Sequence, residues 1–163
     1  MLLEEASAFT EKCFTGDPAS CALACPFHLD VRSMLEKASR QKWNTAYKTY
    51  RNAVRFPVMV QALCPRPCEG KCQRTVTGDE PISIRDVESA CVTYASNKKV
   101  DSYAIPPKAH KIAVIGAGPA GLACALDLAG KKYSVTVFDK NEGWGGHLRV
   151  HELFEAFNEA IVL

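Results

Sequence analysis

Most cysteines of this 163-residue chain lie in two tight groups in its first half. Seven of the eight occur before residue 92, and the shortest spacings are Cys21-x3-Cys25-Pro and Cys64-x3-Cys68-x3-Cys72. Thiols at such spacings can bind zinc, hold an iron–sulfur cluster or form disulfides. Disulfides need an oxidising compartment, and the first residues lack the basic segment of a secretory signal. We therefore expect reduced thiols in the cytoplasm.

The spacing favours iron–sulfur chemistry, while zinc and simply packed thiols stay open as alternatives. Structural zinc sites usually use Cys-x2-Cys pairs and gather four ligands around one ion. Iron–sulfur clusters are held by closely spaced cysteines plus a remote one, often with proline after the last cysteine. Cys25-Pro26 and Cys64-Pro65 fit the second pattern better.

The other candidate ligands in the chain are interpreted as structural residues. His28 follows Pro26 by two positions and is expected at the surface or as a capping residue. Cys91 and Cys124 lie beside alanines in segments with helical periodicity, so we expect both to be small buried hydrophobes.

A glycine-rich loop in the second half has the context of a dinucleotide site. The loop consists of Gly116, Ala117, Gly118, Pro119, Ala120 and Gly121. Apolar segments flank it, and Asp139 ends the next apolar segment. The glycines allow a tight turn, a close approach of N–H groups to a pyrophosphate, and close helix packing. The helix N-terminus adds partial positive charge, and Asp139 can accept a hydrogen bond from a ribose hydroxyl.

The cofactor expected at this loop is FAD. An acid at position 139 would repel a 2′-phosphate, which favours FAD or NAD over NADP. Gly145-Gly146, six residues further on, resembles the second glycine pair of flavoprotein FAD domains. This resemblance favours FAD over NAD. The alternative is a glycine-rich turn that binds no ligand.

Apolar periodicity predicts helices first and a β-α-β unit afterwards. The expected helices span residues 2–12, 31–39, 43–54 and 84–98, with Asp30 as an N-cap and Pro57 as an interruption. Residues 112–115 suit a buried strand, a helix follows to about residue 129, and residues 135–138 form a second strand. The fold class is therefore α plus α/β, with a helical domain over 1–105 and the start of a Rossmann-like unit over 106–163.

Composition argues against two kinds of partner. There are 20 Lys and Arg residues against 18 Asp and Glu, a net charge of +2, and no basic stripe interleaved with aromatics. A nucleic-acid partner is therefore not expected. The longest uncharged stretch, residues 112–126, is shorter than a membrane span needs, and glycines and a proline interrupt it.

Three segments in order resemble the glutamate synthase small-subunit family, which includes the N-terminal part of dihydropyrimidine dehydrogenase and related FAD-dependent pyridine-nucleotide oxidoreductases. The first is Cys-Pro-Arg-Pro-Cys-Glu-Gly-Lys-Cys at 64–72. The second is Glu-Pro-Ile-Ser-Ile at 80–84, followed by Glu88. The third is Val-Ile-Gly-Ala-Gly-Pro-Ala-Gly-Leu at 114–122. The combination is far more specific than either motif alone.

The resemblance implies a helical domain with two [4Fe-4S] clusters, followed by FAD and NAD(P)H domains. NAD(P)H would reduce the flavin by hydride transfer, and single electrons would pass through the clusters. Carried over by position, the ligands of one cluster are Cys13, Cys21 and Cys72. Those of the other are Cys25, Cys64 and Cys68, with Glu88 at the place of a non-cysteine oxygen ligand. The residues that would hold FAD are Gly116, Gly118, Gly121 and Asp139.

Two departures from the family pattern bear on this expectation. The first cysteine group of the family reads Cys-x2-Cys-x4-Cys-x3-Cys-Pro, and here Gly16 replaces the second cysteine, which leaves the first cluster three thiolates. After Gly146 the family continues with Gly-Ile-Pro, whereas here the sequence is His-Leu-Arg. One β-α-β unit cannot enclose a dinucleotide, and a second glycine loop for NAD(P)H is missing. The chain thus looks like a truncated frame or excised piece, whose FAD and NAD(P)H sites another domain or subunit would complete.

The leading functional hypothesis is an electron-transfer part of an NAD(P)H oxidoreductase that is not competent alone. One alternative is an interaction module whose cysteines bind zinc, without redox activity. Another is a flavin enzyme with vestigial cysteines.

Overall fold

The structure is a computed structural model that describes residues 13, 19–98, 104–155 and 157. The chain divides into two compact units, Met1–Lys98 and Lys99–Leu163, and each is described by itself. The boundary suggested by the sequence, between residues 105 and 106, stays a prediction. The helix expected over residues 2–12 and the position of Gly16 lie outside the described residues.

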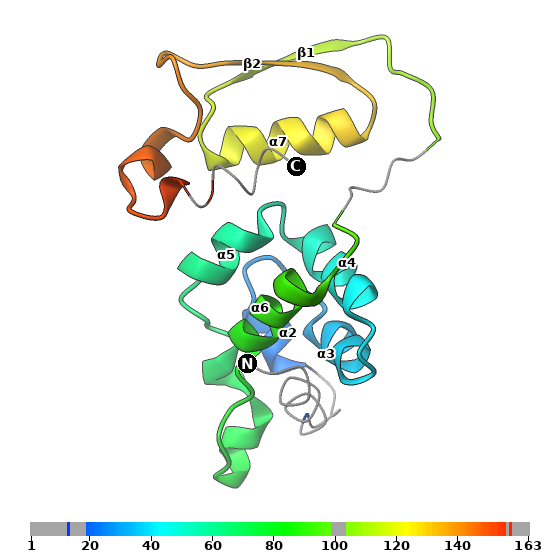
Figure 1. Ribbon diagram of the computed structural model, residues 1–163, viewed down its shortest axis with the longest axis vertical. Helices are drawn as coiled ribbons and strands as arrows, with labels where there is room; N and C mark the ends of the chain where they lie inside the picture. Colours follow the sequence, from blue (N-terminus) through cyan, green and yellow to red (C-terminus); the bar gives the residue numbers. More distant parts are fainter. Residues whose placement is uncertain (1–12, 14–18, 99–103, 156, 158–163) are drawn as a thin grey trace. The chain divides into compact units, whose positions relative to one another are not determined.

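The described part of the first unit is built from short helices (Figure 1). Its α-helices are α2 (Ser20–Ala24), α3 (Val31–Ser39), α4 (Trp43–Ala53), α5 (Pro57–Leu63) and α6 (Ile84–Tyr94). Two 3-10 helices, η1 (Glu69–Lys71) and η2 (Gln73–Thr77), lie between α5 and α6. Three of these helices were predicted, because their apolar residues recur at helical spacing.

Local signals explain where these helices begin and end. The Asp30 carboxylate accepts a hydrogen bond from the Ser33 N–H at 3.0 Å, which confirms Asp30 as the N-cap of α3. Pro57, predicted as an interruption, begins α5, where the missing N–H of a proline costs nothing. Helix α6 ends at Tyr94, earlier than predicted, because Ala95 adopts an extended backbone.

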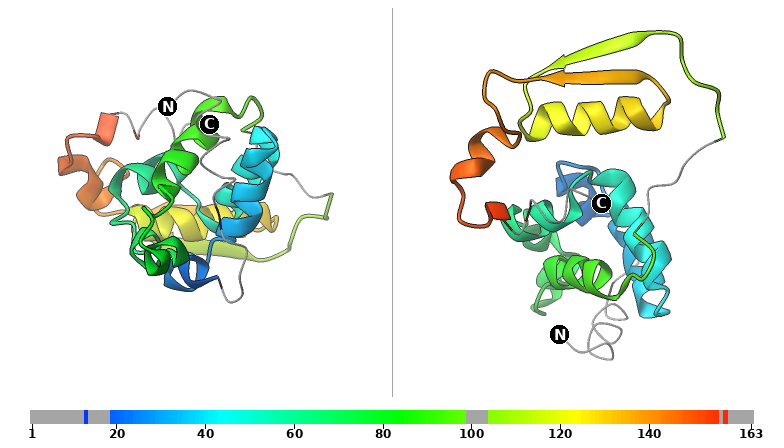
Figure 2. Two further views of the ribbon diagram at one scale, coloured as in Figure 1. Left: turned by 90° about the horizontal axis from the view of Figure 1, so that it is seen from below. Right: turned by 45° about the horizontal axis from the view of Figure 1, so that its top comes forward.

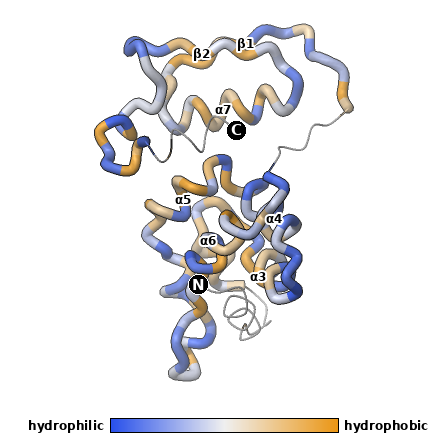
Figure 3. The backbone as a smooth tube through the Cα atoms, viewed as in Figure 1, coloured by the Kyte–Doolittle hydropathy of each residue, from blue (hydrophilic) through white to orange (hydrophobic). Residues whose placement is uncertain are grey.

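The core of the first unit lies where α3, α4 and α6 pack together. Apolar positions recur between hydrophilic ones along α3 and α4 (Figure 3), so each helix has one face for the core. Met34, Tyr50 and Val87 are fully buried there. The Tyr50 hydroxyl donates to the Pro57 carbonyl at 3.1 Å, which satisfies a polar group inside an apolar cluster. This core fixes the segments that carry the cysteines.

The second unit contains the predicted β-α-β motif. Strands β1 (Lys111–Ile115) and β2 (Ser134–Phe138) are parallel, with Lys111 opposite Ser134 and Ile115 opposite Phe138. Helix α7 (Pro119–Gly130) connects them and packs against both, covering one face of the two-stranded sheet (Figure 2). A 3-10 helix, η3 (Gly146–Val150), follows. The parallel pairing needs this crossover helix.

Two expectations for the second unit are wrong. The strand over residues 112–115 was expected to be buried, but Ile115 is 81% exposed. Cys124 was expected to be buried in α7, and it is exposed. Both follow from one cause: in the described residues the sheet has two strands and α7 covers one face, whereas parallel strands are buried when helices cover both.

In the part of the chain described here, no helix is long and apolar enough to cross a membrane.

Candidate metal and dinucleotide sites

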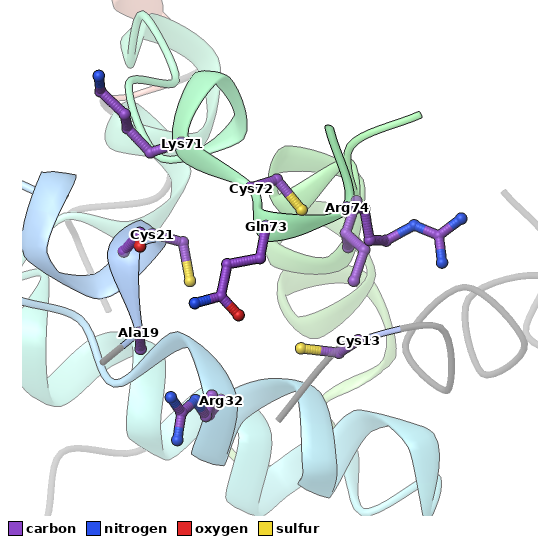
Figure 4. A pocket seen from close by; sticks show the side chains of 10 residues that line it. Cys13, Ala19, Cys21, Arg32, Lys71, Cys72, Gln73 and Arg74 are labelled. Carbon is purple, nitrogen blue, oxygen red and sulfur yellow. The ribbon is translucent and has the colours of Figure 1, made fainter. Parts of the chain in front are cut away.

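Cys13, Cys21 and Cys72 line one cavity of the first unit and are called the first thiol set. Their sulfur atoms point toward a common space, although they come from separate segments (Figure 4). Cys21 lies in α2, which packs against η1, and Cys72 lies between η1 and η2. The Cys72 carbonyl accepts hydrogen bonds from the N–H and the hydroxyl of Thr75, at 3.1 and 2.7 Å. These hydrogen bonds fix the backbone from which the Cys72 thiol projects.

Positive charge surrounds the first thiol set. Arg32, Lys71 and Arg74 also line the cavity. Burial raises the pKa of the Cys13 thiol, and the nearby Cys21 and Cys72 raise it further, while Arg32 and Arg74 oppose the shift. Burial also raises the pKa of Cys21, against backbone hydrogen bonds and Arg32. Cys13 and Cys21 therefore favour the neutral thiol until a metal compensates the charge of their thiolates.

Cys25, Cys64 and Cys68 form the second thiol set. Burial raises the pKa of the Cys68 thiol to about 12, and repulsion by Glu88, Cys25, Glu69 and Cys64 adds to the shift. Cys68 is 7% exposed, Cys25 is the C-cap of α2, and Cys64 is the C-cap of α5. The backbone N–H of Arg66 donates to the Cys64 sulfur at 3.5 Å. The set is thus assembled from the ends of two helices and the loop that follows.

Glu88 projects from α6 beside the second thiol set and is 9% exposed. Burial raises its pKa to about 7, repulsion by Glu69 adds to the shift, and a hydrogen bond with the Tyr50 hydroxyl and the charge of Arg85 oppose it. Burial of the Tyr50 phenol raises its pKa, and the neighbouring Glu88 raises it further. A buried carboxyl group near three thiols is an oxygen donor that a metal could recruit.

Sequence reasoning missed the charged groups around the second thiol set. Glu69 accepts a hydrogen bond from the Arg85 N–H at 3.1 Å and lies 3.6 Å from the Arg66 guanidinium. The Arg85 guanidinium donates to the Cys64 carbonyl. Each of these residues comes from the segment between α5 and the first turn of α6, yet no spacing rule connects them. Their role depends on the tertiary fold, which the sequence pattern alone does not give.

The remaining cysteine and histidine of interest lie outside both sets. Cys91 is completely buried in the core, which confirms its interpretation as a small hydrophobe. His28 is exposed, as expected for a surface residue.

The donor chemistry of the two thiol sets fits iron–sulfur clusters. In the part of the chain that the structure describes, no three His, Cys, Asp or Glu side chains meet closely enough to hold one metal ion. A [4Fe-4S] cluster needs its ligands further apart than a single metal ion does, because each thiolate binds a separate iron and the thiols surround the cluster. The first thiol set lines a cavity in this way, and half-buried cysteine thiols are donors that iron binds as thiolates.

The glycine loop of the second unit has the geometry of a phosphate-binding turn. Gly116 adopts a positive φ of 103°, and its N–H donates to the Phe138 carbonyl at 2.6 Å, which ties the loop to the end of β2. A Cβ at position 121 would collide with the Gly116 carbonyl, so only glycine permits this approach of α7 to the loop. Gly118 caps α7 and Pro119 begins it, with Ala120 in the same first turn. The first N–H groups of the helix are thereby aimed at the loop.

Asp139 holds the loop as well as facing solvent. Its Oδ2 accepts a hydrogen bond from the Ala117 N–H at 2.6 Å, and its Oδ1 accepts from the Asn141 N–H at 2.8 Å. These two backbone hydrogen bonds, in that order, lower the pKa of Asp139, so the carboxylate is ionised at neutral pH. A carboxylate has about four acceptor positions, and room is left for a ribose hydroxyl.

Gly145 and Gly146 pack directly on the glycine loop. The Gly145 N–H donates to the Ala117 carbonyl at 2.7 Å, and a Cβ at position 146 would lie 3.1 Å from the Gly118 Cα. Both glycines have positive φ angles, 106° and 54°. Beside them lies an open pocket of about 430 Å³. The residues that line it include Ala117, Asp139 and Trp144. The predicted cofactor residues thus gather in one place, and the glycine cradle fits a dinucleotide.

Residues 1–100 match the family described as "Dihydroprymidine dehydrogenase domain II, 4Fe-4S cluster". The chain belongs to this family. Residues 114–159 match the family described as "NAD(P)-binding Rossmann-like domain". The two thiol sets lie in the first family's segment, and the glycine loop and Asp139 lie in the second. The resemblance drawn from the sequence is confirmed at this level.

Curated relatives resemble the chain over most of its length. It is 32% identical to the NADPH-Fe(3+) oxidoreductase subunit beta of Geobacter sulfurreducens over 131 residues, 78% of this chain and 19% of that protein. It is 32% identical to the glutamate synthase [NADPH] small chain of Bacillus subtilis, over 76% of this chain and 25% of that protein. It is 28% identical to the NADP(+)-dependent formate dehydrogenase subunit beta of Moorella thermoacetica, over 89% of this chain and 23% of that protein. The chain thus spans about a fifth to a quarter of these relatives.

Proposed function

We propose that this chain is the N-terminal portion of an oxidoreductase that depends on FAD and [4Fe-4S] clusters and takes its electrons from NAD(P)H. The observation that carries the proposal is the convergence of six thiols into two sets. Each set draws on cysteines that are distant in sequence, and none of the six forms a disulfide. Thiols that gather without disulfides are typical of metal and cluster ligands in a reducing compartment, so we also propose a cytoplasmic location.

The two thiol sets are proposed as the ligands of separate clusters. The first set, Cys13, Cys21 and Cys72, would bind one cluster, and the second set, Cys25, Cys64 and Cys68, would bind the other. Glu88 would supply an oxygen ligand to the second cluster. Its burial beside Cys68 supports this role, because a carboxylate held there costs free energy until a cation compensates it.

When bound, FAD would accept a hydride from NAD(P)H, and the clusters would carry its two electrons onward singly. The chain's own contribution is positioning and charge. Thiolates anchor the irons, and Arg32 and Arg74 offset negative charge at the first set. Gly116, Gly118 and Gly121 let the backbone reach a pyrophosphate, and Asp139 orients the loop.

A further domain or subunit is proposed to complete the flavin and NAD(P)H sites. The pocket beside Asp139 is open, and the apolar strand residues Ile115 and Phe138 are 81% and 53% exposed. A dinucleotide is normally enclosed at the ends of several parallel strands, with helices on both faces of the sheet. The relatives are four to five times longer than the chain's matched segment, which leaves length for such a domain.

The decisive experiment measures iron, acid-labile sulfide and zinc on protein purified without oxygen. We expect iron and sulfide in roughly equal amounts, little zinc, and broad absorbance near roughly 400 nm that dithionite bleaches. In a separate measurement, FAD is added to the protein. If the glycine loop binds the cofactor, the fluorescence of the added FAD should be quenched.

Stoichiometric zinc without sulfide would overturn the redox proposal in favour of a zinc-binding module. Protein with flavin but without iron would overturn the cluster assignment alone, because the glycine loop lies in the other unit.

A further inference from the structure

The first thiol set is one donor short of a complete [4Fe-4S] site. It contains three thiols, and Gly16 stands where the family pattern has a fourth. An iron of such a cluster that has no ligand from the protein is held only by an exogenous group such as water and is readily lost. A firmly held fourth iron at this site would therefore take a protein donor other than these three cysteines.

The lining of the cavity narrows the choice of that donor. Among the described residues that line the cavity, the cationic side chains of Arg32, Lys71 and Arg74 have no lone pair to offer a metal. Ala19 and Ile82 have no side-chain donor atom, and two oxygen-bearing side chains of this described lining are left, Ser20 and Gln73. A hydroxyl must lose a proton to bind iron well, whereas a carboxamide oxygen can bind as it is.

Gln73 is positioned for this role. Figure 4 shows its carboxamide extending between the sulfur atoms of Cys13, Cys21 and Cys72. Gln73 follows Cys72 directly and begins η2, whose first turn is fixed by the hydrogen bonds of Thr75 to the Cys72 carbonyl. The same backbone segment thus presents a thiol and an amide to one cavity.

We propose that the Gln73 side-chain oxygen is the fourth ligand of the first cluster, in place of the cysteine that Gly16 replaces. The inference rests on the proposed function, since it assumes that the first thiol set holds a cluster. A neutral amide makes the cluster one charge less negative than four thiolates would. Its reduction potential is therefore higher, and the iron bound to oxygen is the one most easily lost.

The test compares Gln73→Ala with wild type and with the matched control Ser20→Ala, all purified without oxygen. Iron is counted per chain, and electron paramagnetic resonance is recorded on the oxidised protein. Wild type and Ser20→Ala should have complete clusters. Gln73→Ala should lose about one iron per chain and gain the signal of an oxidised [3Fe-4S] cluster. The spectrum of the second cluster serves as an internal check on folding.

Two restoring variants keep the inference testable if Gln73→Ala binds iron poorly. Gln73→Cys should keep all the iron and shift the first potential downward. Gly16→Cys, added to Gln73→Ala, should recover the lost iron and abolish the [3Fe-4S] signal. Complete clusters in Gln73→Ala, or a [3Fe-4S] signal already present in wild type, would overturn the role of Gln73 and leave the proposed function intact. Wild-type protein without iron and sulfide would overturn the proposed function itself.

Discussion

The two thiol sets contain equal numbers of cysteines in opposite electrostatic surroundings. Arg32 and Arg74 counteract the rise in thiol pKa at the first set, whereas Glu88 and Glu69 add to the rise at the second. Positive charge favours the more negative, reduced form of a bound cluster, and negative charge disfavours it. The comparison therefore predicts that the first cluster has the higher potential and holds an electron more readily than the second.

The largest expected effect comes from Cys68→Ser. Cys68 is 7% exposed, so the substitution removes a thiolate ligand and leaves a hydroxyl in an apolar site. We expect loss of the second cluster, about half of the iron, and a lower melting temperature of the helical unit. Iron analysis and circular dichroism measure these effects.

Cys124→Ser is the matched control for Cys68→Ser. Cys124 is exposed on α7 and belongs to neither thiol set. The control should keep its full iron content and its melting temperature. A Cys68→Ser protein with iron equal to that of the control would remove Cys68 from the ligands.

The second prediction concerns the pH dependence of the metal-free protein. The pKa of Glu88 is about 7 in the folded chain against an ordinary value of 4.5, so the folded state holds a proton that the unfolded state has lost. The free energy of unfolding should fall by on the order of 3 kcal/mol as pH rises from about 4.5 to about 7, and then level off. Glu88→Gln should abolish this slope and raise the stability at pH values above 7. Urea unfolding at several pH values checks this, and equal slopes in both proteins would contradict it.

The third prediction separates the potentials of the two clusters. Arg32→Gln removes a cation that lowers the pKa of Cys13 and Cys21. The potential of the first cluster should fall by on the order of tens of millivolts while that of the second stays unchanged. Redox titration followed by electron paramagnetic resonance measures both. Arg40→Gln is the control on the same segment, since Arg40 is exposed and pairs with Glu36 at 2.9 Å.

The grouping of the thiols marks the limit of what spacing can predict. Spacing alone pairs Cys21 with Cys25 and Cys68 with Cys72, but the structure separates both pairs into different sets. The resemblance to a family implied this crossed grouping, because it carries information on tertiary structure that a local pattern lacks. The role of these thiols as ligands stays a prediction.

Local features were predicted well, whereas burial in the second unit was not. Helix α3 has the expected bounds because the Asp30 cap and the apolar spacing are properties of neighbouring residues. The exposure of Ile115 and Cys124 depends on which segments cover the sheet, and no residue near them in sequence encodes that. Gln73 and Arg32 were missed for the same reason, since only the tertiary fold brings them to Cys13.

The last prediction uses the second unit as a reference for both clusters. Asp139→Ala removes the acceptor of the Ala117 N–H and Asn141 N–H hydrogen bonds, so the glycine loop loses one of its ties to the end of β2 and keeps the bond between the Gly116 N–H and the Phe138 carbonyl. Backbone amides at Gly116 to Gly118 should exchange hydrogen faster, and FAD should bind roughly tenfold more weakly. Iron content and both cluster potentials should stay as in wild type, because the thiol sets belong to the other unit. Asp139→Asn, which keeps one acceptor oxygen, should have an intermediate effect. A change in either cluster potential would mean that the loop and the clusters are coupled, and the contrast between the thiol sets would then depend on more than the ligands and charges beside each set.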